Sequence, residues 1–148
     1  MSQQPLVVSS SMPTRTYTSR LENLERISQF IVQQARLAGL SEAEIYQVEL
    51  AVDEAATNII EHAYGGNTRL KIHCTCELLD DGLKVVLQDY AKPFDPTSVP
   101  DPVIGMPIED LPPRGLGIFL IRKMMDEVSY RFNKEEGNVL IMVKRKQG

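Results

Sequence analysis

The spacing of the apolar residues changes along the chain, and this change limits the folds that the chain can adopt. Before residue 66, apolar residues recur every three or four positions, as in amphipathic helices. From residue 69 they alternate with polar residues, as in strands with one buried face. A helical pattern returns near residue 115, before a last alternating pair. This order favours an α+β fold in which helices pack on one face of a mixed, mainly antiparallel sheet.

Two capping boxes predict where the first two helices begin. In a capping box, a serine side chain and a glutamate side chain three residues later bond each other's backbone amides. Ser19 and Glu22 predict a helix that ends at Gly39, and Ser41 and Glu44 predict a second helix that ends at residues 65–66. The apolar stripes expected to face the core are Leu21, Leu24, Ile27, Ile31, Ala35 and Ala38 in the first helix, and Ile45, Val48, Val52, Ala55, Ile59 and Ala63 in the second.

The alternating segments predict two antiparallel hairpins. Residues 69–89 form the first, around turn residues at 80–82. Residues 128–143 form the second, with a turn at Gly137 and Asn138. The two hairpins together supply most of the expected sheet.

Proline predicts where regular structure is interrupted. Apolar residues at 6–8, before Pro13, are expected to form an edge strand. Residues 90–113 contain seven of the nine prolines, too many for a helix or a strand. A long irregular segment in a compact domain usually has a function, so we expect a lid at about 90–114.

The composition fits one globular domain over residues 1–148. The chain is 43% hydrophobic and 24% charged, and its net charge of -4 disfavours direct binding to nucleic acid or to anionic membranes. The sequence has neither a leader pattern nor an apolar run of about 20 residues, so we expect a cytoplasmic protein. Cys74 and Cys76 lie two positions apart on one strand face, which predicts reduced core thiols.

The second helix carries candidate catalytic residues. Glu54, Asn58 and Glu61 cluster on one face of a helical wheel, opposite the apolar stripe. A carboxylate and an amide one turn apart can bind Mg²⁺ through oxygen, or one can bind the metal while the other accepts a proton. The alternative is a solvated acidic face near a helix N-terminus.

Two further segments are candidates for ligand binding. Gly115, Leu116 and Gly117 precede a helix, so their amides could receive phosphate oxygens beside Arg114; alternatively they form a hinge. Asp89, at the end of a strand, can accept a hydrogen bond from an exocyclic amine such as that of adenine, or cap a turn.

Three segments in this order resemble the anti-sigma factor serine kinases, a family of GHKL ATPases. Residues 49–64 resemble the N box of that family, residues 89–96 its first glycine box, and residues 114–126 its second. The resemblance covers the chain from the first helix onward. It implies the Bergerat ATP-binding fold, with a layer of helices over a sheet and a mobile ATP lid.

The resemblance also implies roles for individual residues. Glu54 would be the catalytic base, Asn58 would hold Mg²⁺ against the nucleotide, and Asp89 would bind the adenine amino group. Ala91 stands where the family usually has glycine, which would cost about 1 kcal/mol or more if that position needs a positive φ or a close approach. The residues expected beside the phosphates are Arg114, Gly115, Leu116 and Gly117.

The function implied by the resemblance is ATP-dependent phosphorylation of a serine or threonine in a STAS-type anti-sigma factor antagonist. The same resemblance implies that the chain sequesters a sigma factor and forms a homodimer. One alternative is a nucleotide-dependent binding module without turnover. Others are the detached ATPase part of a histidine kinase, for whose phosphoacceptor helix the chain has no room, and an acidic metal binder that does not bind nucleotide.

Overall fold

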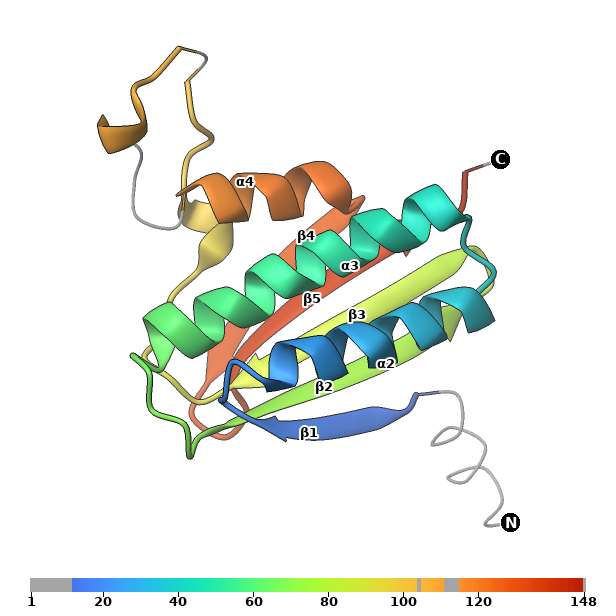
Figure 1. The fold of residues 1–148 in the computed structure, drawn as a ribbon, viewed down its shortest axis with the longest axis horizontal. Coiled ribbons are helices and arrows are strands. Elements are labelled where there is room, and N and C mark those ends of the chain that lie inside the picture. Colours follow the sequence, from blue (N-terminus) through green and yellow to red (C-terminus); the bar gives the residue numbers. More distant parts are fainter. Residues whose placement is uncertain (1–11, 104, 111–114, 148) are drawn as a thin grey trace.

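The computed structural model describes residues 12–103, 105–110 and 115–147. Figure 1 shows a layer of helices in front of one twisted sheet. The elements in chain order are β1 (Thr14–Thr18), α2 (Asn23–Leu37), α3 (Glu42–Thr57), the π-helix η1 (Asn58–Ala63), β2 (Lys71–Leu79), β3 (Gly82–Asp89), the 3₁₀ turns η2 (Pro96–Ser98) and η3 (Ile108–Asp110), α4 (Gly115–Met124), β4 (Glu127–Asn133) and β5 (Gly137–Arg145).

The sheet has the strand order β1-β2-β3-β5-β4, and α2, α3 and α4 cover one of its faces (Figure 1). This arrangement confirms the α+β class. Every strand pair in the described residues is antiparallel, so the expectation of a mixed sheet was wrong in this detail. The pairs β2–β3 and β4–β5 are hairpins, and β1 is joined to β2 through α2 and α3. The chain passes from β3 through α4 to β4, which lies at the edge of the sheet beyond β5. None of the described helices is both long and apolar enough to span a bilayer.

The core lies between the helices and the covered face of the sheet. Ile31 of α2 and Val48 of α3 are fully buried against β2 and β3. Cys74 and Cys76 are buried free thiols on the same face, as expected. Burial of side chains of this kind supplies most of the free energy that holds the layers together.

The helix α2 begins later than the sequence predicted. It starts at Asn23 without a side-chain cap, so the expected capping box of Ser19 and Glu22 was wrong. The buried Ser19 hydroxyl instead donates to the carbonyl of Asn67 and accepts from the amide of Leu70 at 3.2 Å, which ties the start of β2 to the end of β1. Leu21, expected in the core, is consequently exposed outside the helix.

The helix α3 begins at the predicted capping box. The amide of Glu44 donates to Ser41 Oγ at 3.1 Å, and the amide of Ser41 donates to Glu44 Oε1 at 2.8 Å. At Asn58 the helix widens into the π-helix η1, which ends before Gly65 and Gly66, both at positive φ. Such π segments are rare and often mark functional sites.

Removal of the α3 cap is expected to destabilise the whole fold. Ser41→Ala should lower the free energy of unfolding by about 1 kcal/mol, because two backbone amides lose their cap. Urea unfolding followed by circular dichroism measures this change. Ser129→Ala, at an exposed position of β4, is the control and should change stability by less than about 0.5 kcal/mol. Equal stability of the two variants would show that the cap contributes nothing.

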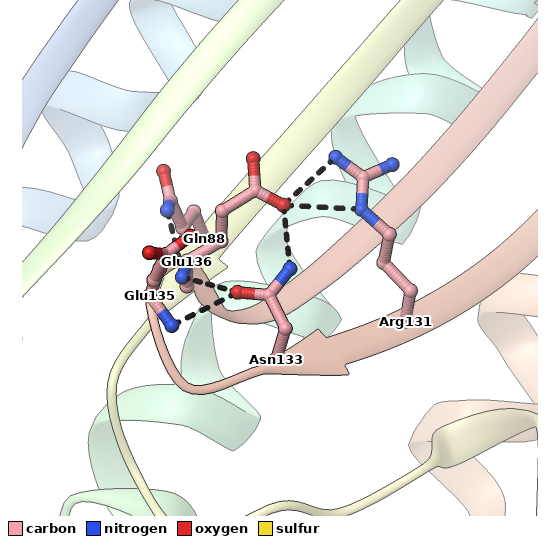
Figure 2. Close-up of polar contacts among 5 residues, drawn as sticks. All are labelled: Gln88, Arg131, Asn133, Glu135 and Glu136. Atoms are coloured by element: carbon pink, nitrogen blue, oxygen red, sulfur yellow. Dashed lines mark hydrogen bonds and ion pairs between the residues drawn. The ribbon is translucent and has the colours of Figure 1, made fainter.

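The second hairpin turns three residues earlier than the sequence predicted. Its turn lies at residues 134–136, and Gly137 already belongs to β5. Figure 2 shows the reason: Asn133 Oδ1 accepts from the amides of Glu135 and Glu136 at 2.9 and 2.7 Å, which closes the turn. Gln88 of β3 also donates to the carbonyl of Glu136 at 2.6 Å. The bond from Gln88 holds the start of β5 beside the end of β3.

Two expected segments fall partly outside the described residues. An edge strand is present, but at β1, where Thr14 pairs with Thr75; residues 6–8 lie outside the described part. Between β3 and α4 the described residues are irregular apart from the 3₁₀ turns, as the prolines predicted. Residues 104 and 111–114, within the expected lid, are not described.

Candidate functional site

Glu54, Asn58 and Gly117 meet where α3 packs against α4. A Cβ built on Gly117 would lie 2.7 Å from Glu54 Oε1 and 3.7 Å from Asn58 Nδ2. The first distance is shorter than real Cβ contacts, so the glycine lets α4 come this close to the carboxylate without displacing it. The structure therefore brings together three residues that the sequence placed in separate motifs. The carboxylate of Glu54 and the amide of Asn58 therefore lie beside the first turn of α4, whose backbone amides can receive an anion.

Glu54 has the electrostatic properties of a proton acceptor. Partial burial raises the pKa of its carboxyl group, and the negative charge of Asp53 raises it further. The sequence has no lysine or arginine between Arg36 and Arg69 that could reverse this effect. A carboxylate with a raised pKa is a stronger base, which is the property that general-base catalysis requires.

Asn58 also lines a cavity of about 50 Å³ between the helices and the sheet. Asp89, at the end of β3, lines the same cavity. The residues that complete the wall are mostly apolar: Ala55, Ile59, Ala63, Lys92, Phe94, Pro96, Ile121, Tyr130, Asn138 and Leu140. Apolar walls with a few polar groups are typical of sites for a flat heterocycle.

The cavity is much smaller than a nucleotide pocket, which typically holds about 300 Å³ or more. Lys92, Phe94 and Pro96 of the segment after β3 form part of its wall. Arg122 of α4 holds this segment, donating to the carbonyl of Pro96 and to Asp101 Oδ1, each at 2.8 Å. Entry of a nucleotide base into the cavity therefore requires this segment to move.

Asp89 is a buried carboxylate with several polar neighbours. Its Oδ1 accepts from the amide of Ala91 at 2.9 Å. Asp89 therefore caps a turn, which is one of the two roles that the sequence predicted for it. The same atom accepts from Asn138 Nδ2 at 3.0 Å. Tyr64 Oη accepts from the amide of Tyr90 at 2.9 Å and thereby connects the end of η1 to the end of β3. Asp89 thus both caps a turn and lines the cavity.

One residue predicted for this site lies elsewhere in the structure. Glu61 was expected beside Glu54 and Asn58, but it is exposed and lines a separate hollow with Ser19 and Leu21. The π-helix explains the difference, because its wider turns displace residues after Asn58 from their α-helical angles.

The glycine segment begins α4. Gly115 is buried and Leu116 is 54% exposed, while Arg114 lies outside the described residues. The first amides of a helix have no partner within it, so they can receive an anion. Gly115, Leu116 and Gly117 are therefore placed where phosphate oxygens could approach α4 next to Glu54.

Sequence reasoning missed three residues of this region: Asn138, Tyr130 and Arg122. Asn138 was assigned to a turn, although the pairing of β3 with β5 places it directly opposite Asp89. Tyr130 Oη donates to Asn138 Oδ1. The available signal was the register of β3 against β5, which becomes evident only when the second turn is placed at residues 134–136.

Comparisons with known proteins identify relatives of this chain. The family model described as "Histidine kinase-like ATPase domain" matches residues 17–144. The protein named "Serine-protein kinase RsbW" from Halalkalibacterium halodurans is 35% identical over 116 residues, which are 74% of this chain and 68% of that protein. The protein of the same name from Staphylococcus epidermidis is 36% identical over 112 residues, 72% of this chain and 69% of that protein.

A solved structure has the same fold. It is the crystal structure of the RsbU and RsbW domains of Rv1364c from Mycobacterium tuberculosis, with a TM-score of 0.64 and 12% sequence identity. The match covers 90% of this chain and 32% of that chain, so this chain corresponds to about a third of the solved protein. The family match over most of the sequence, the relatives and the shared fold lead to one conclusion: the chain belongs to the histidine kinase-like ATPases, in the group of serine-protein kinases.

Proposed function

We propose that this chain transfers the γ-phosphoryl group of ATP to a serine or threonine hydroxyl of a STAS-type anti-sigma factor antagonist. The observation that carries the proposal is the close approach of Glu54 and Asn58 to Gly117, in the first turn of α4. A phosphoryl transfer needs a base close to the groups that hold the phosphate, because the acceptor hydroxyl and the phosphate must approach each other in line. The relatives named serine-protein kinase support this reaction class.

Each residue of the site has a role in the proposal. Glu54 accepts the proton of the attacking hydroxyl, and its raised pKa suits this step. Asp89 accepts a hydrogen bond from the amino group of adenine inside the apolar cavity. The phosphate contacts come from the start of α4: Arg114, Gly115, Leu116 and Gly117.

A magnesium ion fits the donor set of this site. Asn58 presents a side-chain amide beside the Glu54 carboxylate, and oxygen ligands of these types suit Mg²⁺. When bound, Mg²⁺ neutralises charge on the phosphate oxygens. We assign Asn58 as the residue that holds it.

The partners in the proposal follow from the family to which the chain belongs. The chain would bind a sigma factor when it is not engaged with the antagonist, and it would act as a homodimer without contacting nucleic acid or membranes. We place it in the cytoplasm, because its two cysteines are buried free thiols, which suit a reducing compartment. The competing function is a nucleotide-dependent binding module without turnover, which would bind ATP and partners but transfer no phosphate.

Titration calorimetry with ATP tests the nucleotide site first. Wild-type protein should bind ATP more tightly with Mg²⁺ than without it, and Asn58→Ala should weaken Mg²⁺-dependent binding by about 10- to 100-fold. Asn67→Ala is the matched control, because Asn67 is exposed after η1 and its side-chain Oδ1 accepts from the amide of Arg69 in the same loop. Binding of ATP that is independent of both Mg²⁺ and Asn58 would contradict the proposed site.

Phosphotransfer is tested next with purified STAS-domain proteins and radiolabelled ATP. Incorporation of label into a serine or threonine of one of them would establish the reaction. ATP binding without incorporation into any STAS protein would favour the binding module without turnover.

A further inference from the structure

Asn138 is a buried amide placed between the cavity carboxylate and the segment that closes the cavity. It lies opposite Asp89 in the β3–β5 pair and is 6% exposed. Its Nδ2 donates to Asp89 Oδ1 at 3.0 Å and to the carbonyl of Ala91 at 2.9 Å. Its Oδ1 accepts from Tyr130 Oη and from the amide of Phe94, the latter at 3.4 Å. Both the nitrogen and the oxygen of the Asn138 side-chain amide are therefore hydrogen-bonded.

The neighbours of Asn138 fix the direction in which its amide points. The carbonyl of Ala91 can only accept a hydrogen bond, and the amide of Phe94 can only donate one. The nitrogen end must therefore face Ala91 and Asp89, and the oxygen end must face Phe94. In this direction Asn138 presents a donor to Asp89, so the carboxylate is held as an acceptor.

A carboxylate held as an acceptor distinguishes between purines. Adenine has a 6-amino group, which donates a hydrogen bond, whereas hypoxanthine and guanine have a 6-oxo group, which only accepts one. A 6-oxo group facing Asp89 would leave two acceptors in contact inside an apolar cavity, an arrangement with a large desolvation penalty. Because Asp89 accepts a hydrogen bond, a purine with a donor at position 6 fits the cavity and one with an acceptor there does not.

Resting on the proposed function, we propose that Asn138 is a positioning residue that makes the nucleotide site selective for 6-amino purines. It does so by keeping Asp89 an acceptor and by holding residues 91–94 against the cavity, with Tyr130 fixing its amide. The bond from Gln88 to the carbonyl of Glu136 supports this arrangement, because it holds the start of β5 beside β3 (Figure 2).

The test compares ATP with ITP, which differs from ATP by a 6-oxo group in place of the 6-amino group. Wild-type protein should bind ATP about 100-fold more tightly than ITP. In Asn138→Asp, a second carboxylate faces Asp89, and the two must share a proton, so Asp89 can then donate to a 6-oxo group. The ratio of ITP to ATP dissociation constants should fall to about 10 or less, chiefly through weaker ATP binding.

Two further variants keep the test decisive. Tyr130→Phe removes only one hydroxyl, folds without a new buried charge, and should lower the ratio about threefold or more by freeing the Asn138 amide. Asn133→Ala is the control: Asn133 belongs to the same hairpin and to Figure 2 but bonds only turn groups, so the ratio should stay at the wild-type value. Thermal melting verifies that each variant is folded.

The outcomes separate this inference from the proposed function. ATP binding with an unchanged ratio in folded Asn138→Asp and Tyr130→Phe would overturn the role of Asn138 and leave the proposed kinase intact. Wild-type protein that binds neither nucleotide would overturn both. A lowered ratio in Asn133→Ala equal to that in Asn138→Asp would show that the effect is a general disturbance of the hairpin, and would also overturn the inference.

Discussion

Glu54→Gln is expected to lower the rate of phosphotransfer by about 10²- to 10⁴-fold, which is the usual contribution of a general base. Glutamine has the shape of glutamate but cannot accept the hydroxyl proton. ATP binding should change little, because in the proposed site Glu54 acts on the hydroxyl of the acceptor and not on the nucleotide. Calorimetry for binding and a radiolabel assay for transfer measure the two quantities separately.

The control for this variant is Glu61→Gln. Glu61 has the same charge and lies seven residues further along, but it is exposed in a separate hollow, so its replacement should leave the transfer rate unchanged. If Glu54→Gln retained the wild-type rate, another group would have to accept the proton and the assignment of Glu54 would be wrong.

The pH dependence of the phosphotransfer rate is a second test of the assignment of Glu54 as the base. Since burial and Asp53 raise the pKa of Glu54, activity should fall with decreasing pH at values above the usual range of a glutamate, as the carboxylate becomes protonated. Asp53→Asn removes one of the two causes and should move this decline to lower pH.

Gly117→Ala is expected to lower phosphotransfer by about 100-fold, because its Cβ would displace the catalytic carboxylate and small displacements of a reacting group cost that much. The added carbon would lie 2.7 Å from Glu54 Oε1, so the carboxylate must move. Stability should not explain the loss, since alanine within a helix is favoured over glycine by about 0.5–1 kcal/mol. Initial rates and thermal melting distinguish the two effects.

A double variant isolates the contact between Gly117 and Glu54. In the Glu54→Gln background, Gly117→Ala should reduce the rate far less than it does alone, because the displaced group has already lost its function. Lys123→Ala, at an exposed position of the same helix, is the control and should retain the wild-type rate. Independent, multiplicative losses in the double variant would mean that Gly117 acts on something other than Glu54.

The fold could be predicted where local chemistry decides the structure. Ser41 and Glu44 form a capping box, and the contact of Glu44 across the fold, from the amide of Gln147, uses the other carboxylate oxygen and leaves the box intact. Ser19 and Glu22 show the same spacing, but a contact across the fold, from Ser19 to the chain before β2, uses the serine instead. The sequence pattern is identical, so only the packing of distant segments distinguishes the two sites.

The candidate site was predictable to a similar extent. Glu54, Asn58 and Gly117 could be proposed from motifs and family resemblance, and the structure brings them together. Their roles stay predictions, as do those of Arg114 and Asp89. Asn138 could not be found in this way, because its importance depends on which residue of β5 faces Asp89, and the assumed turn at Gly137 and Asn138 gave no such pairing.

The hydrogen bonds of Arg122 connect α4 to the segment that closes the cavity. Arg122 belongs to the helix that carries Gly117, and it bonds both Pro96 and Asp101 of the segment that closes the cavity. When that segment swings outward, it either breaks both bonds at once or pulls α4 with it. In the second case Gly117 moves relative to Glu54. Through Arg122, the position of the segment that covers the cavity and the distance between Gly117 and Glu54 are then coupled.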